Sequence, residues 1–274
     1  MDAFFALIVA IPIGLLGGLI GLGGAEFRLP VLVGVFKRSA RQAVPINLAI
    51  SLMTLVSSLF IRLKVLPEFP YASLWLPIGT LILGGVVFAF LGAGWISQIP
   101  LHRLEALIRY FLILIGVLLL IEGVFSFPVG HLLQASPWVQ GIVGILCGAI
   151  IGVVSSTLGV AGGELIIPTL IFIFGIDVKL AGTASLMISL PTVVTGIIRY
   201  TRKGLYRERK EWYTLIGPMG LGSIAGAILG GILVGTISGQ WLKVILGLVL
   251  IASAVRMFIH HHQSQNSQKV DFKL

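Results

Sequence analysis

Long apolar blocks dominate this sequence and limit what it can fold into. Of the 274 residues, 57% are hydrophobic and 11% are charged, and the mean hydropathy is +1.07. A soluble domain has about a quarter of its residues charged, so this composition suits lipid rather than water. A block of about 20 apolar residues has the length of a helix that spans a bilayer. Because such a helix satisfies its own backbone hydrogen bonds, we expect an all-α polytopic membrane protein.

The apolar blocks predict about eight transmembrane helices, of which the first and the fifth are broken. The expected spans are Ala3–Ile20, Ala43–Ile61, Ala72–Ile96, Leu104–Val124, Trp138–Leu158, Leu180–Ile198, Tyr213–Ile237 and Trp241–Ile259. After each broken span we expect a short helix, at Phe27–Phe36 and at Leu165–Phe174. The polar tail from His260 to Leu274 is expected to be flexible.

A single offset of 138 residues aligns the second half of the chain with the first. The aligned pairs include Gly14/Gly152, Gly21/Gly159, Gly24/Gly162, Glu26/Glu164, Pro30/Pro168, Ser51/Ser189, Gly84/Gly222 and Leu104/Leu242. We therefore predict a first transmembrane repeat at 1–124, a connector at 125–137, a second repeat at 138–260 and a polar tail at 261–274. Repeats of this size in transporters place the substrate site at their interface, near the middle of the membrane. The alternative is a duplicated helical bundle that transports nothing.

The two breaks are the strongest candidates for a binding site. Glycines fill both of them, at Gly21, Gly23 and Gly24 and again at Gly159, Gly162 and Gly163. The first backbone N–H groups of a helix lack intrahelical partners and favour an anion. Two such helix starts facing each other would form an anion cradle, which glycines let a ligand approach. The alternative is that the glycines only allow helices to pack closely.

Three charged residues follow the breaks inside apolar blocks. Glu26 and Glu164 either cap the short helices or take up a proton and couple transport to the proton gradient. Arg28 has no charged counterpart, since the offset gives Ile166. It either pairs with Glu26 or forms half of an anion site.

A polar stripe follows one face of the second span and recurs in the sixth. Asn47, Ser51, Thr54 and Ser58 are spaced by four, three and four residues, so they share a helix face. The offset returns the same spacing as Ser185, Ser189, Thr192 and Gly196. Such a stripe either holds helices together or lines a hydrated path.

The charge distribution indicates a membrane orientation. The net charge is +9, but the basic residues lie in short loops between apolar blocks, which argues against nucleic-acid binding and fits a protein embedded in the lipid bilayer. We expect the loops that begin at Arg62 and at Arg199 to be cytoplasmic, together with the C-terminus. The side chains of Arg62 and Arg199 are expected to extend to the membrane–water interface. Lys37, Arg38 and Arg41 would then lie outside, so either their loop tucks into the protein or the short helix is re-entrant. The number of crossings decides between parallel and inverted repeats.

Enzyme and metal signatures are absent from the sequence. It contains no HExxH, Walker or GxSxG motif and no clustered carboxylate pair. Cys147 is the single cysteine. We therefore expect no catalytic residues, no metal and no cofactor.

These residues resemble a known family, the TauE/SafE or 4-toluene sulfonate uptake permease family. Its hallmark is similar to Gly159-Val160-Ala161-Gly162-Gly163-Glu164-Leu165-Ile166-Ile167-Pro168, with a weaker copy from Gly21 to Pro30, and Ala181-Gly182-Thr183-Ala184-Ser185 also resembles a family segment. In the first copy Ala25 replaces a common third glycine, and Glu26 and Arg28 add charges. The resemblance implies a bacterial or archaeal plasma-membrane carrier of sulfur-containing anions such as sulfite and sulfonates, often in export.

The sequence therefore predicts a secondary active transporter that works by alternating access between two halves. The expected substrate is a small sulfur-containing anion, with protons as the coupling ion at Glu26 or Glu164. The alternatives are an anion channel, or a membrane-embedded accessory subunit that handles a sulfur species with a partner. The expected substrate-binding residues are Gly21, Gly23, Gly24, Arg28, Asn47, Ser51, Gly159, Gly162, Gly163, Ser185 and Ser189. The oligomeric state is left open.

Overall fold

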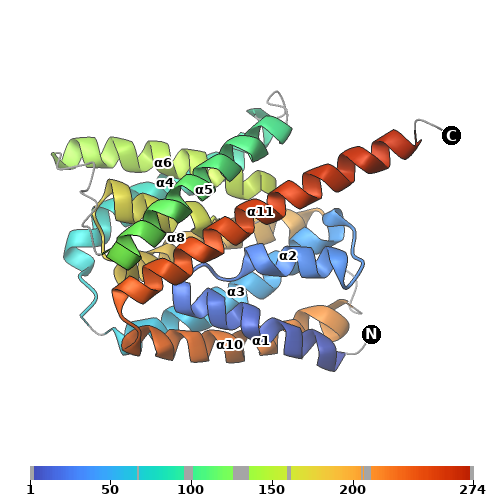
Figure 1. Cartoon of the computed structure of the whole chain (residues 1–274), viewed down its shortest axis with the longest axis horizontal. Coiled ribbons are helices and arrows are strands. Elements are labelled where there is room, and N and C mark those ends of the chain that lie inside the picture. Colours follow the sequence, from blue (N-terminus) through green and yellow to red (C-terminus); the bar gives the residue numbers. More distant parts are fainter. Residues whose placement is uncertain are drawn as a thin grey trace.

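The computed structural model describes residues 3–66, 68–95, 101–125, 136–158, 162–204, 206 and 211–271. For 40–41, 90–95, 101–105, 107, 156–158 and 256–271 it describes the backbone alone. Within these ranges the regular structure is entirely helical (Figure 1). Seven helices are long and apolar enough to cross a membrane, and the shorter apolar helices Gly163–Ile173 and Gly239–Val255 accompany them. The expectation of an all-α polytopic membrane protein is confirmed.

The helices keep the order that the apolar blocks predict. They are α1 (Ala3–Ile20), α2 (Ala25–Gly34), α3 (Ala40–Val65), α4 (Tyr71–Trp95), α5 (Leu101–Phe125), α6 (Pro137–Leu158), α7 (Gly163–Pro168), η2 (Thr169–Ile173), α8 (Val178–Arg202), η3 (Trp212–Ile216), α10 (Gly217–Thr236) and α11 (Gly239–Asp271). Helix α11 continues to Asp271, so most of the polar tail is helical, while its flexibility stays a prediction. Its last stretch has no glycine or proline to end it.

The most extensive helix contacts join the two halves of the chain. α1 packs on α10, α4 on α6, α5 on α11, α3 on both α10 and α8, and α4 on α8. When each helix is replaced by the helix that lies 138 residues away in the sequence, the same set of helix pairs results. Close backbone contacts follow the same rule: a Cβ on Gly14 would lie 2.2 Å from the Ser223 carbonyl oxygen, and a Cβ on Gly152 would lie 2.2 Å from that of Gly85. This pattern accords with the duplication, which stays an inference from the sequence.

The short helix α2 is re-entrant. As a result, the second segment of the chain (138–260) runs in the opposite direction to the first segment (1–124). α1 starts at the end of the bundle that holds both chain termini, which we name the terminal face (Figure 1). α2 returns the chain to that face, where Arg38 forms an ion pair with Glu211 at 3.0 Å. At the same face the Tyr206 hydroxyl donates to the Pro45 carbonyl at 2.8 Å. Burial raises the pKa of Tyr206, which keeps it a donor. The two segments therefore run in opposite directions.

The expected placement of the basic loops is therefore wrong. α3 runs antiparallel to α8, because Arg62 near the end of α3 contacts Thr183 near the start of α8. The loop after Arg62 lies at the end where α3 finishes and α8 begins, which we name the opposite face. The loop after Arg199 lies at the terminal face, together with Lys37 and Arg38. Each segment contains an odd number of helices, so it ends at the face opposite to the one where it began. The second segment therefore starts from the other face, which the sequence left open.

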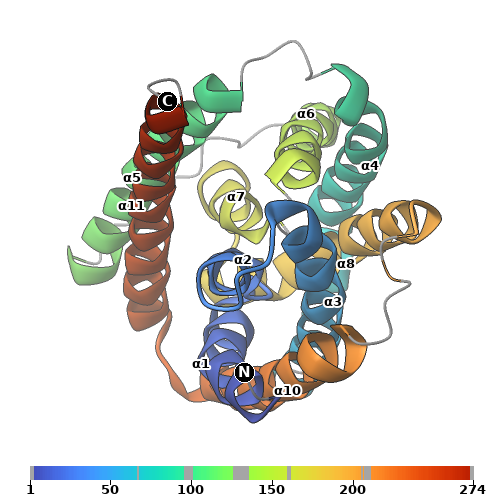
Figure 2. The same ribbon diagram turned by 90° about the vertical axis from the view of Figure 1, so that its right-hand side faces the viewer.

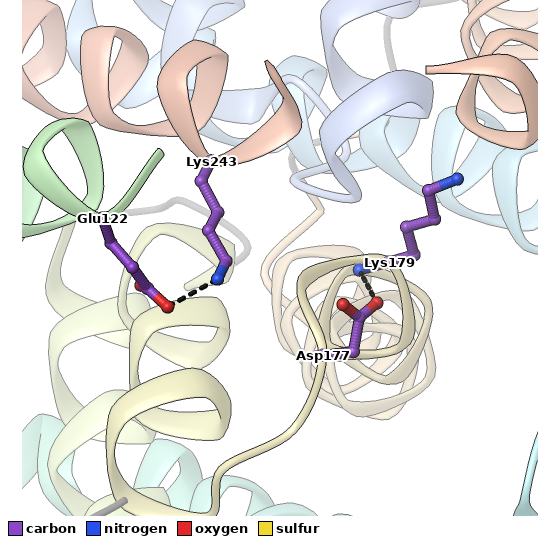
Figure 3. Close-up of polar contacts among 4 residues, drawn as sticks. All are labelled: Glu122, Asp177, Lys179 and Lys243. Carbon is purple, nitrogen blue, oxygen red and sulfur yellow. Dashed lines mark hydrogen bonds and ion pairs between the residues drawn. The ribbon is translucent and has the colours of Figure 1, made fainter. Parts of the chain in front are cut away.

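Helices α5 and α11 pair at one side of the bundle (Figure 2). Near the opposite face the Lys243 ammonium forms an ion pair with the Glu122 carboxylate, whose side chain is 8% exposed (Figure 3). In the same region Asp177 caps α8 by accepting a 2.8 Å hydrogen bond from the Lys179 backbone N–H. Since removing one partner of a buried ion pair strands the other charge, Glu122 and Lys243 hold these two helices together.

Candidate functional site

The two short helices occupy the centre of the bundle and begin in the same way (Figure 2). Gly24 immediately precedes α2 with a φ of 72°, and Gly162 immediately precedes α7 with a φ of 76°. These left-handed conformations are ones that L side chains adopt at a cost, so glycine is needed at both positions. Neither residue supplies a side-chain cap, which leaves the first N–H groups of each helix without a local side-chain acceptor.

The two breaks touch each other. A Cβ on Gly163, at the start of α7, would lie 3.1 Å from Cα of Leu22 in the first break. Gly21 packs against Gly182 of α8, and Gly23 packs against Leu55 of α3. Gly159 lies outside the described residues. The breaks are therefore adjacent, as a two-part cradle requires.

The two glutamates lie near each other but have different partners. Glu26 is 9% exposed, and neither of its carboxylate oxygens has a hydrogen-bond partner in another described residue. Glu164 is half-buried; its side chain bonds with Ser253 of α11, while Oε1 has no partner among the described residues. The two carboxyl groups are close enough to interact electrostatically, and so are Glu26 and Arg28.

Arg28 is fully buried, and neutral groups surround its guanidinium. Its partners are five oxygens, on Asn47 at 3.3 Å, Ser51 at 3.0 Å, Thr54 at 3.0 Å, Ser223 at 3.2 Å and the Gly23 backbone at 3.5 Å. Nε has no partner among the described residues, and no ion pair joins Arg28 to Glu26 within them. Asn47 also donates to the Ala25 carbonyl at 3.0 Å and so ties α3 to the start of α2.

The polar stripe of α3 therefore binds a cation of the same chain. Its dipoles stabilise a buried positive charge without neutralising it. This arrangement holds α2 to α3, as the first interpretation of the stripe predicts, and it places a buried charge at the centre; the hydrated path stays a prediction. A buried guanidinium whose hydrogen-bond partners are neutral is a group that can bind an anion.

The second half of the centre is less charged. Ile166 occupies the place that corresponds to Arg28 and is 1% exposed. On α8, Ser185 and Ser189 are both fully buried, and the Ser185 hydroxyl has no partner among the described residues. The candidate site is thus asymmetric, with a guanidinium in one half and hydroxyls in the other.

Three residues of this centre were not identified from the sequence. Ser223 binds Arg28 from α10, and Ser253 binds Glu164 from α11; both lie in small-residue runs that look like packing. Arg62 is the third, and its expected position at the interface is wrong. It is fully buried, and it donates to the carbonyls of Gly18 and Leu19 in the last turn of α1. Its place at the end of an apolar block gave no sign of these contacts.

Comparisons with known proteins point to one family. Residues 6–257 match the family model described as "Sulfite exporter TauE/SafE". The chain is 26% identical over 226 residues to the "Probable membrane transporter protein YdhB" of Bacillus subtilis, covering 82% of this chain and 87% of that protein. It is 32% identical over 133 residues to the "Probable membrane transporter protein MJ0441" of Methanocaldococcus jannaschii, covering 46% of this chain and 48% of that protein. No solved structure matches significantly.

Proposed function

The chain belongs to the TauE/SafE sulfite exporter family, and from this premise we propose that it is a secondary active transporter that exports a small sulfur-containing anion. The observation that best supports this proposal is the position of Arg28. Its guanidinium is fully buried beside the first break and is held there by hydrogen bonds to neutral side chains. A sulfite or sulfonate group offers several acceptor oxygens and a negative charge, which suit a guanidinium and free helix N–H groups. The substrate, the direction and the coupling ion are parts of this proposal.

The inverted arrangement supports alternating access. Two segments of opposite direction that meet at a central site give a carrier two related conformations, each open to one face. The contact between Gly163 and Leu22, which brings the two breaks together, supports this proposal.

The charge at the two ends supports an orientation in the plasma membrane. The terminal face carries the basic residues Lys37, Arg38, Arg199, Arg202 and Lys203 and the acidic residue Glu211. At the opposite face, the loops that flank α3 and α8 carry acidic and basic residues in balance, namely Lys64, Glu68, Asp177 and Lys179. By the positive-inside rule, the terminal face and the C-terminus are cytoplasmic.

Counterflow in proteoliposomes tests the proposal. Purified protein is reconstituted alone, loaded with unlabelled sulfite, and supplied with labelled sulfite, taurine, sulfoacetate or thiosulfate outside. A carrier shows saturable uptake that the internal anion accelerates. Flux that does not saturate and shows no counterflow would instead support an anion channel. Absence of flux until a partner protein is added would support an accessory subunit.

We expect the two central glutamates to couple transport to protons. With both carboxylates ionised, the centre carries two negative charges against the one positive charge of Arg28, and a substrate anion adds another. Uptake of a proton offsets that added charge, so the charge balance at the centre depends on the protonation of these two groups. Replacing both Glu26 and Glu164 with glutamine should therefore abolish the acceleration of flux by a pH gradient while counterflow persists.

Glu68, an exposed glutamate, provides the control. Glu68→Gln should respond to the pH gradient as the natural protein does. If the double variant responds like this control, the coupling group lies elsewhere.

A further inference from the structure

Arg62 makes a set of contacts that transport chemistry at the centre does not require. Its Nη1 donates to the Gly18 and Leu19 carbonyls at 3.0 and 2.9 Å, its Nη2 to the Lys179 carbonyl at 2.7 Å, and its Nε to the Thr183 hydroxyl at 3.0 Å. The first two acceptors lie in the last turn of α1, and the other two lie in the first turns of α8. One side chain of α3 thus binds helix ends from both segments.

These contacts satisfy groups that the first break creates. The last carbonyls of α1 have no intrahelical donor because the helix stops at Ile20, and they form the negative end of its dipole. A positive charge at this position stabilises the end of the helix. A fully buried guanidinium with four hydrogen bonds is therefore well paired here without a carboxylate.

The backbones of the first break and of α8 pack closely against each other beside Arg62. A Cβ on Gly21 would lie 2.2 Å from the Gly182 carbonyl oxygen. A Cβ on Gly182 would lie 2.3 Å from the Ile20 carbonyl oxygen and 2.7 Å from Nη2 of Arg62. The end of α1, the start of α8 and Arg62 therefore form one seal at the opposite face.

The terminal face has no matching seal among the described residues. The 138-residue offset places Tyr200 at the position of Arg62, Val44 at that of Gly182, and Pro45 at that of Thr183. The contacts described there include the Tyr206–Pro45 hydrogen bond and the partly exposed Arg38–Glu211 ion pair. Among the described residues, the guanidinium seal therefore lies at the opposite face.

We infer that Arg62 is a latch that holds the opposite face closed, so that opening this face requires exchange of its four hydrogen bonds for water. The inference rests on the proposed function, since a latch has meaning only in a carrier that opens to both faces. It predicts that opening the two faces has unequal cost.

Thiol labelling tests the latch without measuring transport. In a Cys147→Ser background, Ile20→Cys places a thiol at a position that is 1% exposed, beside the contacts of Arg62. A small membrane-impermeant methanethiosulfonate should label it slowly. Adding Arg62→Gln should raise the labelling rate about tenfold or more, because the charged donor no longer holds the closed state. Arg62→Lys, which keeps the charge but loses the planar fork, should give a smaller increase.

Two controls separate a latch from general unfolding. Leu112→Cys on α5, fully buried and outside the seal, should stay unreactive in every background. Arg199→Gln, at the terminal end of α8, should leave labelling of Ile20→Cys unchanged. Equal labelling of Ile20→Cys with and without the Arg62→Gln substitution overturns the latch. So does a parallel rise at Leu112→Cys, which would show that Arg62 supports the whole fold.

The labelling result and the transport result are independent. If the natural protein shows no anion flux, the proposed function fails whatever the labelling shows. If flux is present and the Arg62 variants label like the natural protein, only the latch fails.

Discussion

Replacing Arg28 with glutamine is expected to reduce anion counterflow by about 100-fold, because truncating one partner of a buried charge pair costs about 2–5 kcal/mol. The guanidinium is fully buried and has no carboxylate bound to it among the described residues, so its charge is available to the substrate. Initial rates of labelled anion uptake in proteoliposomes measure the effect. Arg28→Lys should retain part of the activity, because it keeps the charge but cannot reach all five oxygens.

Two variants show whether the loss comes from the charge. Ser223→Ala removes one acceptor of Arg28 and leaves the charge in place, so it should change transport only severalfold. Arg199→Gln removes a half-buried arginine outside the centre and should leave transport unchanged. If Arg28→Gln, with a normal elution profile in detergent, transports like the natural protein, then Arg28 is a structural residue and the proposed site is wrong.

Replacing Gly21 with alanine is expected to destabilise the protein by about 3–5 kcal/mol, because it adds overpacking to a left-handed conformation. Its φ is 97°, and the new Cβ would lie 2.2 Å from the Gly182 carbonyl oxygen. The atom that the new Cβ would meet belongs to the backbone of Gly182, so no flexible side chain can move aside to make room. The measurement is the fraction of monodisperse protein that survives a heat ramp in detergent.

Gly79→Ala is the matched control for this prediction. Gly79 lies inside α4, and a Cβ there would meet nothing within 4 Å. Alanine should be neutral or stabilising by up to about 1 kcal/mol at a helical position of this kind. A Gly21→Ala variant as stable as Gly79→Ala would mean that the contact between the first break and α8 is not as close as described.

The placement of the short helices could be predicted because it depends on local chemistry. Glycine gives the backbone extra conformational freedom, and proline restricts it, wherever they occur. The breaks at Gly21–Gly24 and Gly162–Gly163 therefore follow from residue type alone. The apolar blocks predicted the spans for the same reason, since a helix that crosses lipid has a fixed length.

The partners of the buried charges could not be predicted in this way. In the sequence, Arg28 and Arg62 look like arginines at a membrane interface; only their contacts distinguish them. The side chains that bind Arg28 lie 19 to 195 residues away from it in the sequence. Arg62 looked like the end of a span and instead joins α1 to α8. Ser223 and Ser253 look like packing residues until the helices are assembled.

The sequence by itself determined the lipid environment, the order of the helices and the position of both breaks, because each follows from the polarity or backbone freedom of residues that are neighbours in the chain. Tertiary structure alone decided the direction of the second segment, because a helix that returns to its starting face has the same composition as one that crosses. It also decided that the two breaks touch, that the stripe on α3 binds Arg28, and that Arg62 seals one face. Each of these depends on contacts between distant helices, and such contacts are fixed only when the whole bundle packs.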